Sequence, residues 1–152
     1  MAERAAATAG TTPPPVLELR GVVRDFGTRV LTRVLHGIDL RLERAEFAAL
    51  IGPSGSGKST LLTILGLLER LSDGDYELDG RSVRALDDDE LTAMRRRTLG
   101  FVFQFHHLLP AFTALENVTL PALARDGHVS AALRERARAL LDGVGLGAAM
   151  QR

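Results

Sequence analysis

The sequence contains no cysteine and no tryptophan, one tyrosine, and a single lysine among nineteen basic residues. Without cysteine, the chain can form neither disulfide bonds nor thiolate metal sites. Its formal net charge is zero, so no overall basic field favours nucleic acid. No apolar stretch approaches the ~20 residues that a membrane-spanning helix requires. The remaining composition, 45% hydrophobic and 25% charged, is typical of a globular domain.

Residues 1–15 are rich in alanine, threonine and proline, and they predict a disordered tail. This stretch lacks the apolar central region of a secretory signal. Together with the absence of cysteine, this favours a cytoplasmic protein whose membrane role, if it has one, depends on a partner.

The single lysine, Lys58, lies in Gly52–Ser59, which matches the pattern G-x-x-x-x-G-K-[ST] at every fixed position. The apolar run at 47–51 predicts a strand buried on both faces, and residues 60–67 repeat apolar side chains at helical spacing. A strand, a glycine-rich loop and a helix, in that order, form the context in which this motif binds phosphate. All other basic residues are arginine, and a planar guanidinium cannot replace a compact ammonium at a crowded phosphate.

The residue types of this loop explain how it would bind a nucleotide. Its glycines let the backbone curl with N–H groups pointing inward, and the following helix adds unpaired donors and the positive end of its dipole. Lys58 would reach the β- and γ-phosphates, and the Ser59 hydroxyl is a suitable ligand for Mg²⁺. A glycine-rich turn without a ligand is the alternative, and eight constrained positions argue against it. The predicted phosphate-contacting residues are Gly52, Pro53, Ser54, Gly55, Ser56, Gly57, Lys58, Ser59 and Thr60.

An antiparallel, half-exposed sheet is predicted before the glycine-rich loop. Alternating or β-branched stretches predict short strands at residues 16–23, 30–35 and 38–42, and a later one at 76–78. Phe26 lies in the turn after the first strand, where a core position is the first interpretation of an aromatic residue.

Helices are predicted in the second half of the chain. Acidic residues at 87–90 precede a helical stretch whose last turn carries three arginines, and such charges complement a helix dipole better than they indicate a metal or nucleic-acid site. Thr113–Glu116 reads as a capping box, and Ser130 caps a longer helix. One face of that longer helix carries Leu133, Ala137, Leu140, Leu141 and Val144.

A second buried strand is predicted at 99–103, and it ends in Gln104. A polar residue at the carboxyl end of a parallel strand lies where α/β sheets bind ligands. His106 and His107 follow in a loop, and adjacent side chains point in different directions, which disfavours a shared metal.

Together these segments resemble the ATP-binding subunit of an ABC transporter. The Walker A run at 52–59 is shared with many P-loop proteins, but FVFQ at 101–104 looks like the family's Q-loop. The stretch QFHHLLPAFTALENV at 104–118 is similar to the lipoprotein-releasing LolD subgroup, which is close to the macrolide-export and FtsE-like ATPases. The resemblance covers residues from Val16 to about Gly147.

The resemblance implies an α/β P-loop NTPase fold with a RecA-like parallel core and an antiparallel β side sheet. Residues 16–104 would form the N-terminal part of the ATPase domain, and residues 105–152 the start of a helical subdomain. In the family, an aromatic residue at the position of Phe26 stacks on adenine, and this interpretation then outweighs a core position. Gln104 would coordinate Mg²⁺ or the attacking water and sense the membrane partner. The implied cofactors are ATP and Mg²⁺, with Ser59 and Gln104 as metal ligands.

The function implied is that of an ATPase that powers lipoprotein release from the inner membrane of a Gram-negative bacterium. The subunit would act as a homodimer at the cytoplasmic face of that membrane, on LolC- and LolE-like permease subunits, without nucleic acid. The alternatives are a macrolide-export or FtsE-like ATPase, a DNA-associated ATPase of the ABC superfamily, and a non-enzymatic regulatory module.

The sequence departs from the family pattern in two places. The turn before the predicted central strand usually carries glycine where this chain has Ala45, and a positive φ there would cost on the order of 1 kcal/mol. The 152 residues also contain no LSGGQ-type signature, Walker B aspartate, catalytic glutamate or switch histidine. Asp142 is rejected as Walker B because it lies in an amphipathic, arginine-rich helix. The chain is therefore expected to be truncated or a fragment that binds nucleotide weakly or not at all and hydrolyses essentially none.

Overall fold

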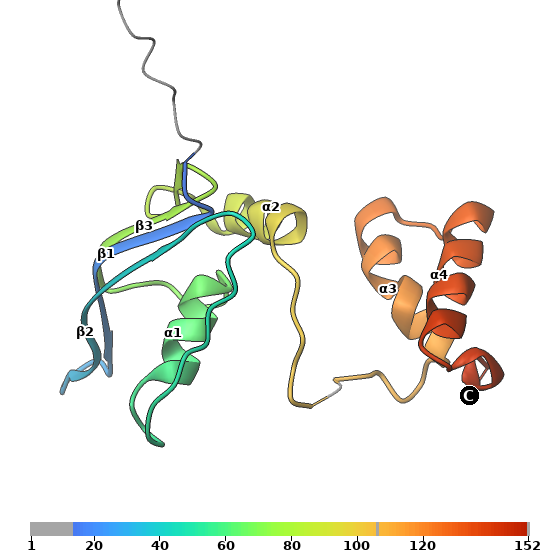
Figure 1. Ribbon diagram of the computed structural model, residues 1–152, viewed down its shortest axis with the longest axis horizontal. Helices are drawn as coiled ribbons and strands as arrows, with labels where there is room; N and C mark the ends of the chain where they lie inside the picture. Colours follow the sequence, from blue (N-terminus) through green and yellow to red (C-terminus); the bar gives the residue numbers. More distant parts are fainter. Residues whose placement is uncertain (1–13, 106, 152) are drawn as a thin grey trace, which may run out of the picture. The chain divides into compact units, whose positions relative to one another are not determined.

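The computed structural model describes residues 14–105 and 107–151 (Figure 1). Most of the tail predicted at 1–15, and also His106, lie outside these described residues. The described chain forms two compact units, the first ending at Phe101 and the second beginning at Val102.

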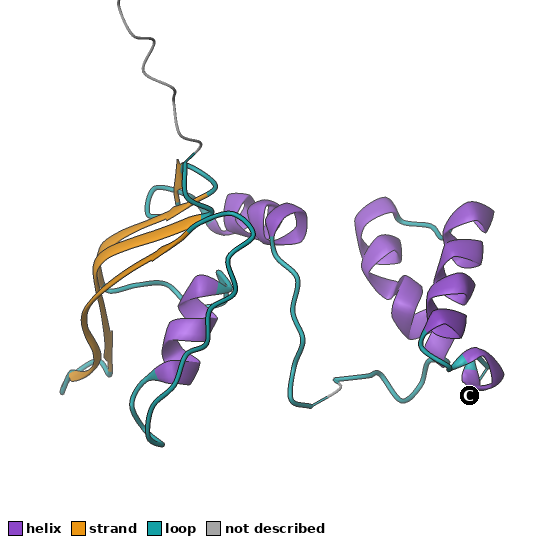
Figure 2. Cartoon of the chain, in the orientation of Figure 1, coloured by secondary structure: helices purple, strands orange, loops and turns teal. Residues whose placement is uncertain are grey.

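The first unit combines an antiparallel sheet with two helices. Its strands are β1 (Leu17–Phe26), β2 (Thr32–Leu42), β3 (Asp73–Leu78) and β4 (Arg81–Ser82), and its helices are α1 (Lys58–Leu65) and α2 (Asp88–Thr98). Within the described residues the strands form one sheet of four in the order β2–β1–β3–β4, drawn in orange in Figure 2. The predicted antiparallel sheet is thus confirmed, and β1 lies inside it with a partner on each side.

Strands β1 and β2 are longer than the sequence analysis predicted. β1 continues through Phe26, which pairs with Thr32, whereas the prediction ended the strand at Val23. β2 is one strand rather than two, and Gly37, with a φ of 79°, lies in it where the register with β1 shifts between Val22 and Val23. The added residues of β1, 24–26, form ladder pairs with residues 32–35 of β2, and residue preferences alone do not reveal such pairing.

The two segments predicted as buried strands, 47–51 and 99–103, are not strands in the structure. Their apolar side chains are largely exposed: Phe47 by 94%, Ile51 by 89% and Phe103 by 54%. A strand is defined by ladder hydrogen bonds to a neighbour, and no described strand pairs with either segment. Both segments are drawn as loops in Figure 2, and the predicted parallel core is absent from the described sheet.

The turn after β2 confirms the strain anticipated at Ala45, whose φ is 62°. Two hydrogen bonds close this turn: the Glu43 backbone N–H donates to Glu46 Oε2 at 2.7 Å, and the Glu46 N–H donates to the Glu43 carbonyl at 3.3 Å. These bonds hold a left-handed conformation that costs an alanine about 1 kcal/mol.

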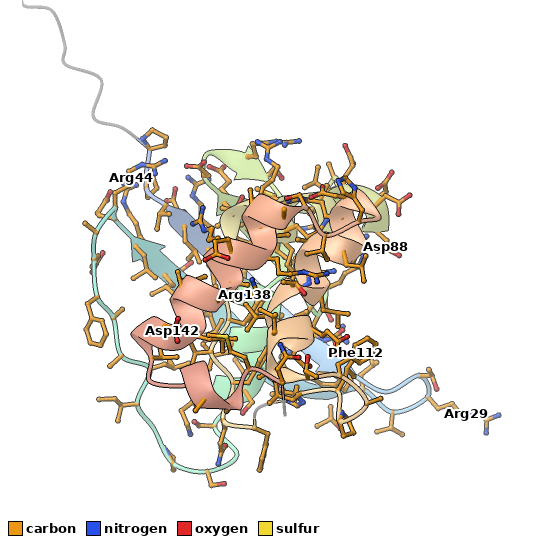
Figure 3. All side chains as sticks on the ribbon, turned by 90° about the vertical axis from the view of Figure 1, so that its right-hand side faces the viewer. Arg29, Arg44, Asp88, Phe112, Arg138 and Asp142 are labelled. Carbon is orange, nitrogen blue, oxygen red and sulfur yellow. The ribbon has the colours of Figure 1, made fainter. Side chains whose placement is uncertain are left out.

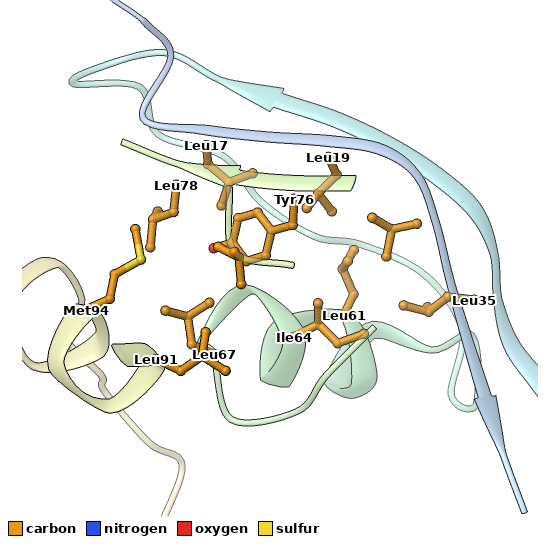
Figure 4. Packing of buried hydrophobic residues seen from close by; sticks show 12 residues of the cluster. Leu17, Leu19, Leu35, Leu61, Ile64, Leu67, Tyr76, Leu78, Leu91 and Met94 are labelled. Carbon is orange, nitrogen blue, oxygen red and sulfur yellow. The ribbon is translucent and has the colours of Figure 1, made fainter. Parts of the chain in front are cut away.

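Tyr76 lies at the centre of the core of the first unit and is only 1% exposed (Figure 4). Around it pack Leu19 from β1, Ile64 from α1 and Leu91 from α2. The Tyr76 hydroxyl donates a hydrogen bond of 2.8 Å to the Leu65 carbonyl, and burial raises the pKa of the phenol. The sheet is thereby fixed to α1, the helix that follows the glycine-rich loop.

A full capping box, which was not predicted, closes the N-terminus of α2. The Asp87 side chain accepts a hydrogen bond of 2.8 Å from the Glu90 backbone N–H, and Glu90 Oε2 accepts one of 3.1 Å from the Asp87 N–H. The first turn is acidic and the last turn carries arginines, so the interpretation of these charges as helix-end charges is consistent with the structure.

The second unit is helical and contains α3 (Ala114–Asp126), α4 (Ala131–Gly143) and a short 3₁₀ helix, η1 (Gly147–Ala149). The capping box at Thr113–Glu116 and the Ser130 cap of α4 are confirmed. Among the described helices of both units, none has the length and hydrophobicity needed to cross a bilayer.

A small core joins α3 and α4 through Leu115, Ala137 and Leu141. Two other members of the predicted apolar face of α4 do not join it, since Leu140 is 57% exposed and Val144 is 70% exposed. Asp142, labelled in Figure 3, lies within α4, which supports its rejection as a Walker B residue.

Candidate phosphate-binding site

The glycine-rich loop, residues 52–57, leads directly into α1 and packs against β2. Gly55 and Gly57 have φ angles of 80° and 87°, in the left-handed region that favours glycine. A Cβ on Gly57 would lie 2.9 Å from Leu35 Cδ2 and 3.1 Å from the Val34 carbonyl oxygen. At this position a side chain is disfavoured both by the backbone conformation and by the close approach of β2.

The start of α1 carries backbone donors for which no partner is found among the described residues. Gly57 is its N-cap, no side chain caps the helix, and its first turn contains no acidic residue. The first helical hydrogen bond, of 2.8 Å, runs from the Leu61 N–H to the Gly57 carbonyl, so the amides of Lys58, Ser59 and Thr60 precede it. Such a helix end attracts anions through its N–H groups and its dipole.

The ammonium group of Lys58 lies over the loop. Lys58 Nζ donates to the carbonyl oxygens of Gly52 at 2.9 Å and Pro53 at 2.6 Å, and it lies 3.5 Å from Ser56 Oγ. All three acceptors are neutral, and Lys58 takes part in none of the ion pairs found among residues 14–105 and 107–151. The loop therefore presents a positive charge with which no carboxylate in the described part of the chain forms an ion pair.

A cavity of about 260 Å³ adjoins the loop. Leu35 and Ile38 line it from β2, Lys58 and Leu61 line it from α1, and residues of the glycine-rich loop complete its wall. One side of the loop thus faces an apolar wall. Pro53, Ser54 and the other loop residues up to Ser56 are exposed.

The predicted Mg²⁺ ligands lie in different units. Ser59 is exposed in the first turn of α1, and Gln104 is exposed in the second unit. In the part of the chain that the structure describes, no group of three or more His, Asp or Glu side chains could hold a metal. Mg²⁺ usually keeps several waters and is bound mainly by the phosphates of a nucleotide. It then needs only one or two protein ligands, and a single hydroxyl can be one of them.

In the loop after Gln104 the structure describes Phe105 and His107, on either side of His106. The His107 ring contacts the Phe103 ring edge-on, with centroids 5.2 Å apart and planes at 88°. His107 also has a φ of 49°.

Phe26, the predicted adenine-stacking residue, is the last residue of β1. This end of the strand lies in the part of the sheet that contacts the glycine-rich loop. Arg24, two residues earlier, pairs with Leu35, and Leu35 contacts the loop at Gly57. The Phe26 side chain is 38% exposed. Figure 3 shows Arg29 pointing away from the fold at the tip of the turn between β1 and β2.

Sequence analysis missed Arg24, whose guanidinium carbon lies 4.3 Å from the centroid of the Phe26 ring. Because the predicted strand ends at Val23, the prediction puts Arg24 in the turn together with Phe26. Residues two apart in a strand share a face, so extending the strand by three residues would have predicted the contact.

Residues 35–152 match the family described as ABC transporter. The chain belongs to the ABC transporter family. Among curated relatives, this ABC chain is 53% identical over 139 residues to the lipoprotein-releasing system ATP-binding protein LolD of Anaeromyxobacter dehalogenans, covering 91% of the chain and 58% of the relative. It is 52% identical over 136 residues to the macrolide export ATP-binding/permease protein MacB of Marinobacter nauticus, covering 89% and 21%.

Solved structures confirm the fold of this ABC chain. The dimeric post-hydrolysis structure of the ATP-binding cassette MJ0796, bound to ADP and Pi, is 40% identical with a TM-score of 0.74, over 83% of this chain and 56% of that one. The predicted family and the P-loop NTPase fold are therefore confirmed. The chain spans less than two thirds of the length of the LolD relatives and of this structure.

Proposed function

We propose that these residues form the nucleotide-binding part of an ATPase subunit of an ABC transporter for lipoprotein release. The observation that carries the proposal is the position of Lys58, unneutralised at the start of α1 and held by loop carbonyls. The Lys58 ammonium, several backbone N–H groups and the positive end of a helix dipole lie together here. This combination attracts the phosphates of a nucleotide.

In this proposal the residues from Gly52 to Thr60 bind the phosphates, and Phe26 stacks on the base. Ser59 and Gln104 are the protein ligands of Mg²⁺, which when bound neutralises phosphate charge. The segments that carry the signature and the catalytic carboxylates are absent from these 152 residues, so hydrolysis would require them from elsewhere in the complete subunit.

The proposed partners are permease subunits of the LolC and LolE type, and the proposed location is the cytoplasmic face of the inner membrane, reached through those partners. The support is the 53% identity to a lipoprotein-releasing ATP-binding protein. The relative MJ0796 is dimeric, which supports a homodimer of the subunit. Macrolide export is the second candidate, because the identity to MacB is nearly as high at 52%.

Depletion of the protein in its own cells separates the two transport functions. We expect outer-membrane lipoproteins to accumulate in the inner membrane, as measured by fractionation and immunoblotting. Normal lipoprotein distribution combined with macrolide hypersensitivity would instead assign the protein to macrolide export.

Substitution of Phe26 by alanine tests the base site. The change should weaken ATP binding by about 1–3 kcal/mol, which is the range for a base stacked on an aromatic side chain. Isothermal titration with ATP and with inorganic tripolyphosphate makes the measurement, and only the ATP affinity should fall. Leu31→Ala, an apolar truncation at a 64% exposed position of the same hairpin, is the control. Equal ATP affinity of the Phe26 variant and this control would contradict base stacking.

A further inference from the structure

The Phe26 ring is in contact with a cation. A guanidinium group, that of Arg24, lies over one face at 4.3 Å from the ring centroid. This is well within the ~6 Å at which a cation is attracted by the negative face of an aromatic ring. With the side chain still 38% exposed, the contact leaves part of the ring open to a ligand.

Arg24 is anchored to the segment that follows α1. Its NH2 group donates to Glu69 Oε1 at 2.6 Å, and its NH1 group reaches Ser72 Oγ at 3.5 Å. Glu69 in turn donates its backbone N–H to the Thr63 carbonyl of α1 at 3.2 Å. The same helix begins at the phosphate-binding loop, so the ring support and the loop are parts of one packed unit.

The loop after α1 also fixes the end of β1. Ser72 Oγ accepts a hydrogen bond of 2.9 Å from the Asp25 N–H, and the Ser72 N–H donates to the Val23 carbonyl at 2.8 Å. Arg24 Nε is buried without a hydrogen-bond partner among the described residues. A buried N–H without a partner is costly, and the electron-rich face of Phe26 compensates the guanidinium in part.

We propose that Arg24 is a positioning residue of the base site, which holds the Phe26 ring from one face so that a purine base stacks on the other. The inference rests on the proposed function, because it assumes that Phe26 contacts the base. The assembled site would be a stack of three layers: guanidinium, phenyl ring and purine. Arg24 contacts neither the base nor the phosphates and acts through the ring.

The expected effect of Arg24→Ala is a loss of ATP affinity of about three- to ten-fold, in line with the strength of a partly exposed cation–π contact. Glu69→Gln should weaken ATP binding in the same direction, since it removes the charge that anchors the guanidinium without changing β1. Arg24→Lys keeps the charge but loses the planar fork, and it should restore only part of the affinity.

Arg33→Ala is the matched control. Arg33 lies on the neighbouring strand of the same hairpin and is also paired to a carboxylate, with Nε 2.9 Å from Asp25 Oδ1. That hydrogen bond is the main cause of the lowered pKa of Asp25. Because no contact joins Arg33 to Phe26 among those found in the described residues, its removal should leave ATP affinity within about two-fold.

The experiment titrates the complete gene product with ATP and with inorganic tripolyphosphate, for the wild type and each variant, after circular dichroism has confirmed folding. Arg24→Ala should lower only the ATP affinity, and the double variant Arg24→Ala/Phe26→Ala should bind ATP no more weakly than Phe26→Ala alone. Additive losses of ATP affinity in the double variant would overturn the role of Arg24. An ATP affinity of Arg24→Ala equal to that of Arg33→Ala would overturn it as well. If Arg24→Ala does not fold, Glu69→Gln decides in the same way.

The same titrations separate this inference from the proposed function. A normal ATP affinity of Phe26→Ala, or a wild-type protein that binds no ATP, would overturn the proposed base site and the inference with it. A weakened Phe26→Ala together with unchanged Arg24→Ala and Glu69→Gln would overturn the inference alone.

Discussion

Replacement of Lys58 by alanine is expected to lower the affinity for ATP by about 100-fold. A hydrogen bond to a charged group contributes about 1.5–3 kcal/mol, and 1.4 kcal/mol is a factor of ten in affinity. Lys58 is the one lysine of the chain, so no other ammonium is available to replace it. Arginine should not restore binding, because Nζ lies between the Gly52 and Pro53 carbonyls at 2.9 and 2.6 Å, where a broad planar group does not fit.

Fluorescence titration with an ATP analogue, on the complete gene product, measures this effect. Arg81→Ala removes an exposed cation from β4 of the same unit and controls for general loss of positive charge. The two alanine variants should have similar unfolding midpoints, since the hydrogen bonds of the Lys58 ammonium found among the described residues all go to the loop. Retention of ATP affinity in the Lys58 variant would refute its phosphate role and, with it, the proposed function.

Substitution of Ile64 by alanine is expected to destabilise the first unit by about 2–5 kcal/mol. Ile64 is 1% exposed and belongs to the cluster around Tyr76, where the sheet packs on α1. Truncation removes apolar contacts on all sides and leaves a cavity that the rigid sheet cannot fill.

Urea unfolding monitored by circular dichroism provides the measurement, and Leu62→Ala is the control within the same helix. Leu62 is 56% exposed, so its truncation should cost less than about 1 kcal/mol. Equal losses for the two variants would mean that α1 does not pack on the sheet as the structure shows.

Local features of the fold were predictable from sequence, and non-local ones were not. The capping box at Thr113–Glu116 involves residues three apart, so a short pattern is sufficient to find it. The segments 47–51 and 99–103 have strand composition, but strand formation depends on a neighbouring strand, which composition cannot supply. The exposure of Leu140 likewise depends on which elements pack on α4, not on the helix itself.

The candidate site also contains residues that were predictable from sequence and residues that were not. The glycine-rich loop could be predicted residue by residue, because its backbone conformation requires glycine at fixed places, and the φ angles of Gly55 and Gly57 agree. Phe26 could be singled out only through family resemblance. Arg24 was missed because the predicted strand ended at Val23, and because its ion pair with Glu69 joins residues that are 45 apart in the sequence.

The turn at Ala45 has a consequence for how this position can vary. Glycine would adopt the φ of 62° without steric penalty, which recovers about 1 kcal/mol. Glycine would also give the unfolded chain more conformations to lose on folding, which costs about 0.4–1 kcal/mol. The two effects nearly cancel, so alanine and glycine are close to equivalent here. A larger or β-branched residue would have the steric penalty of the left-handed conformation without a compensating effect on the unfolded chain. The turn should therefore tolerate it poorly.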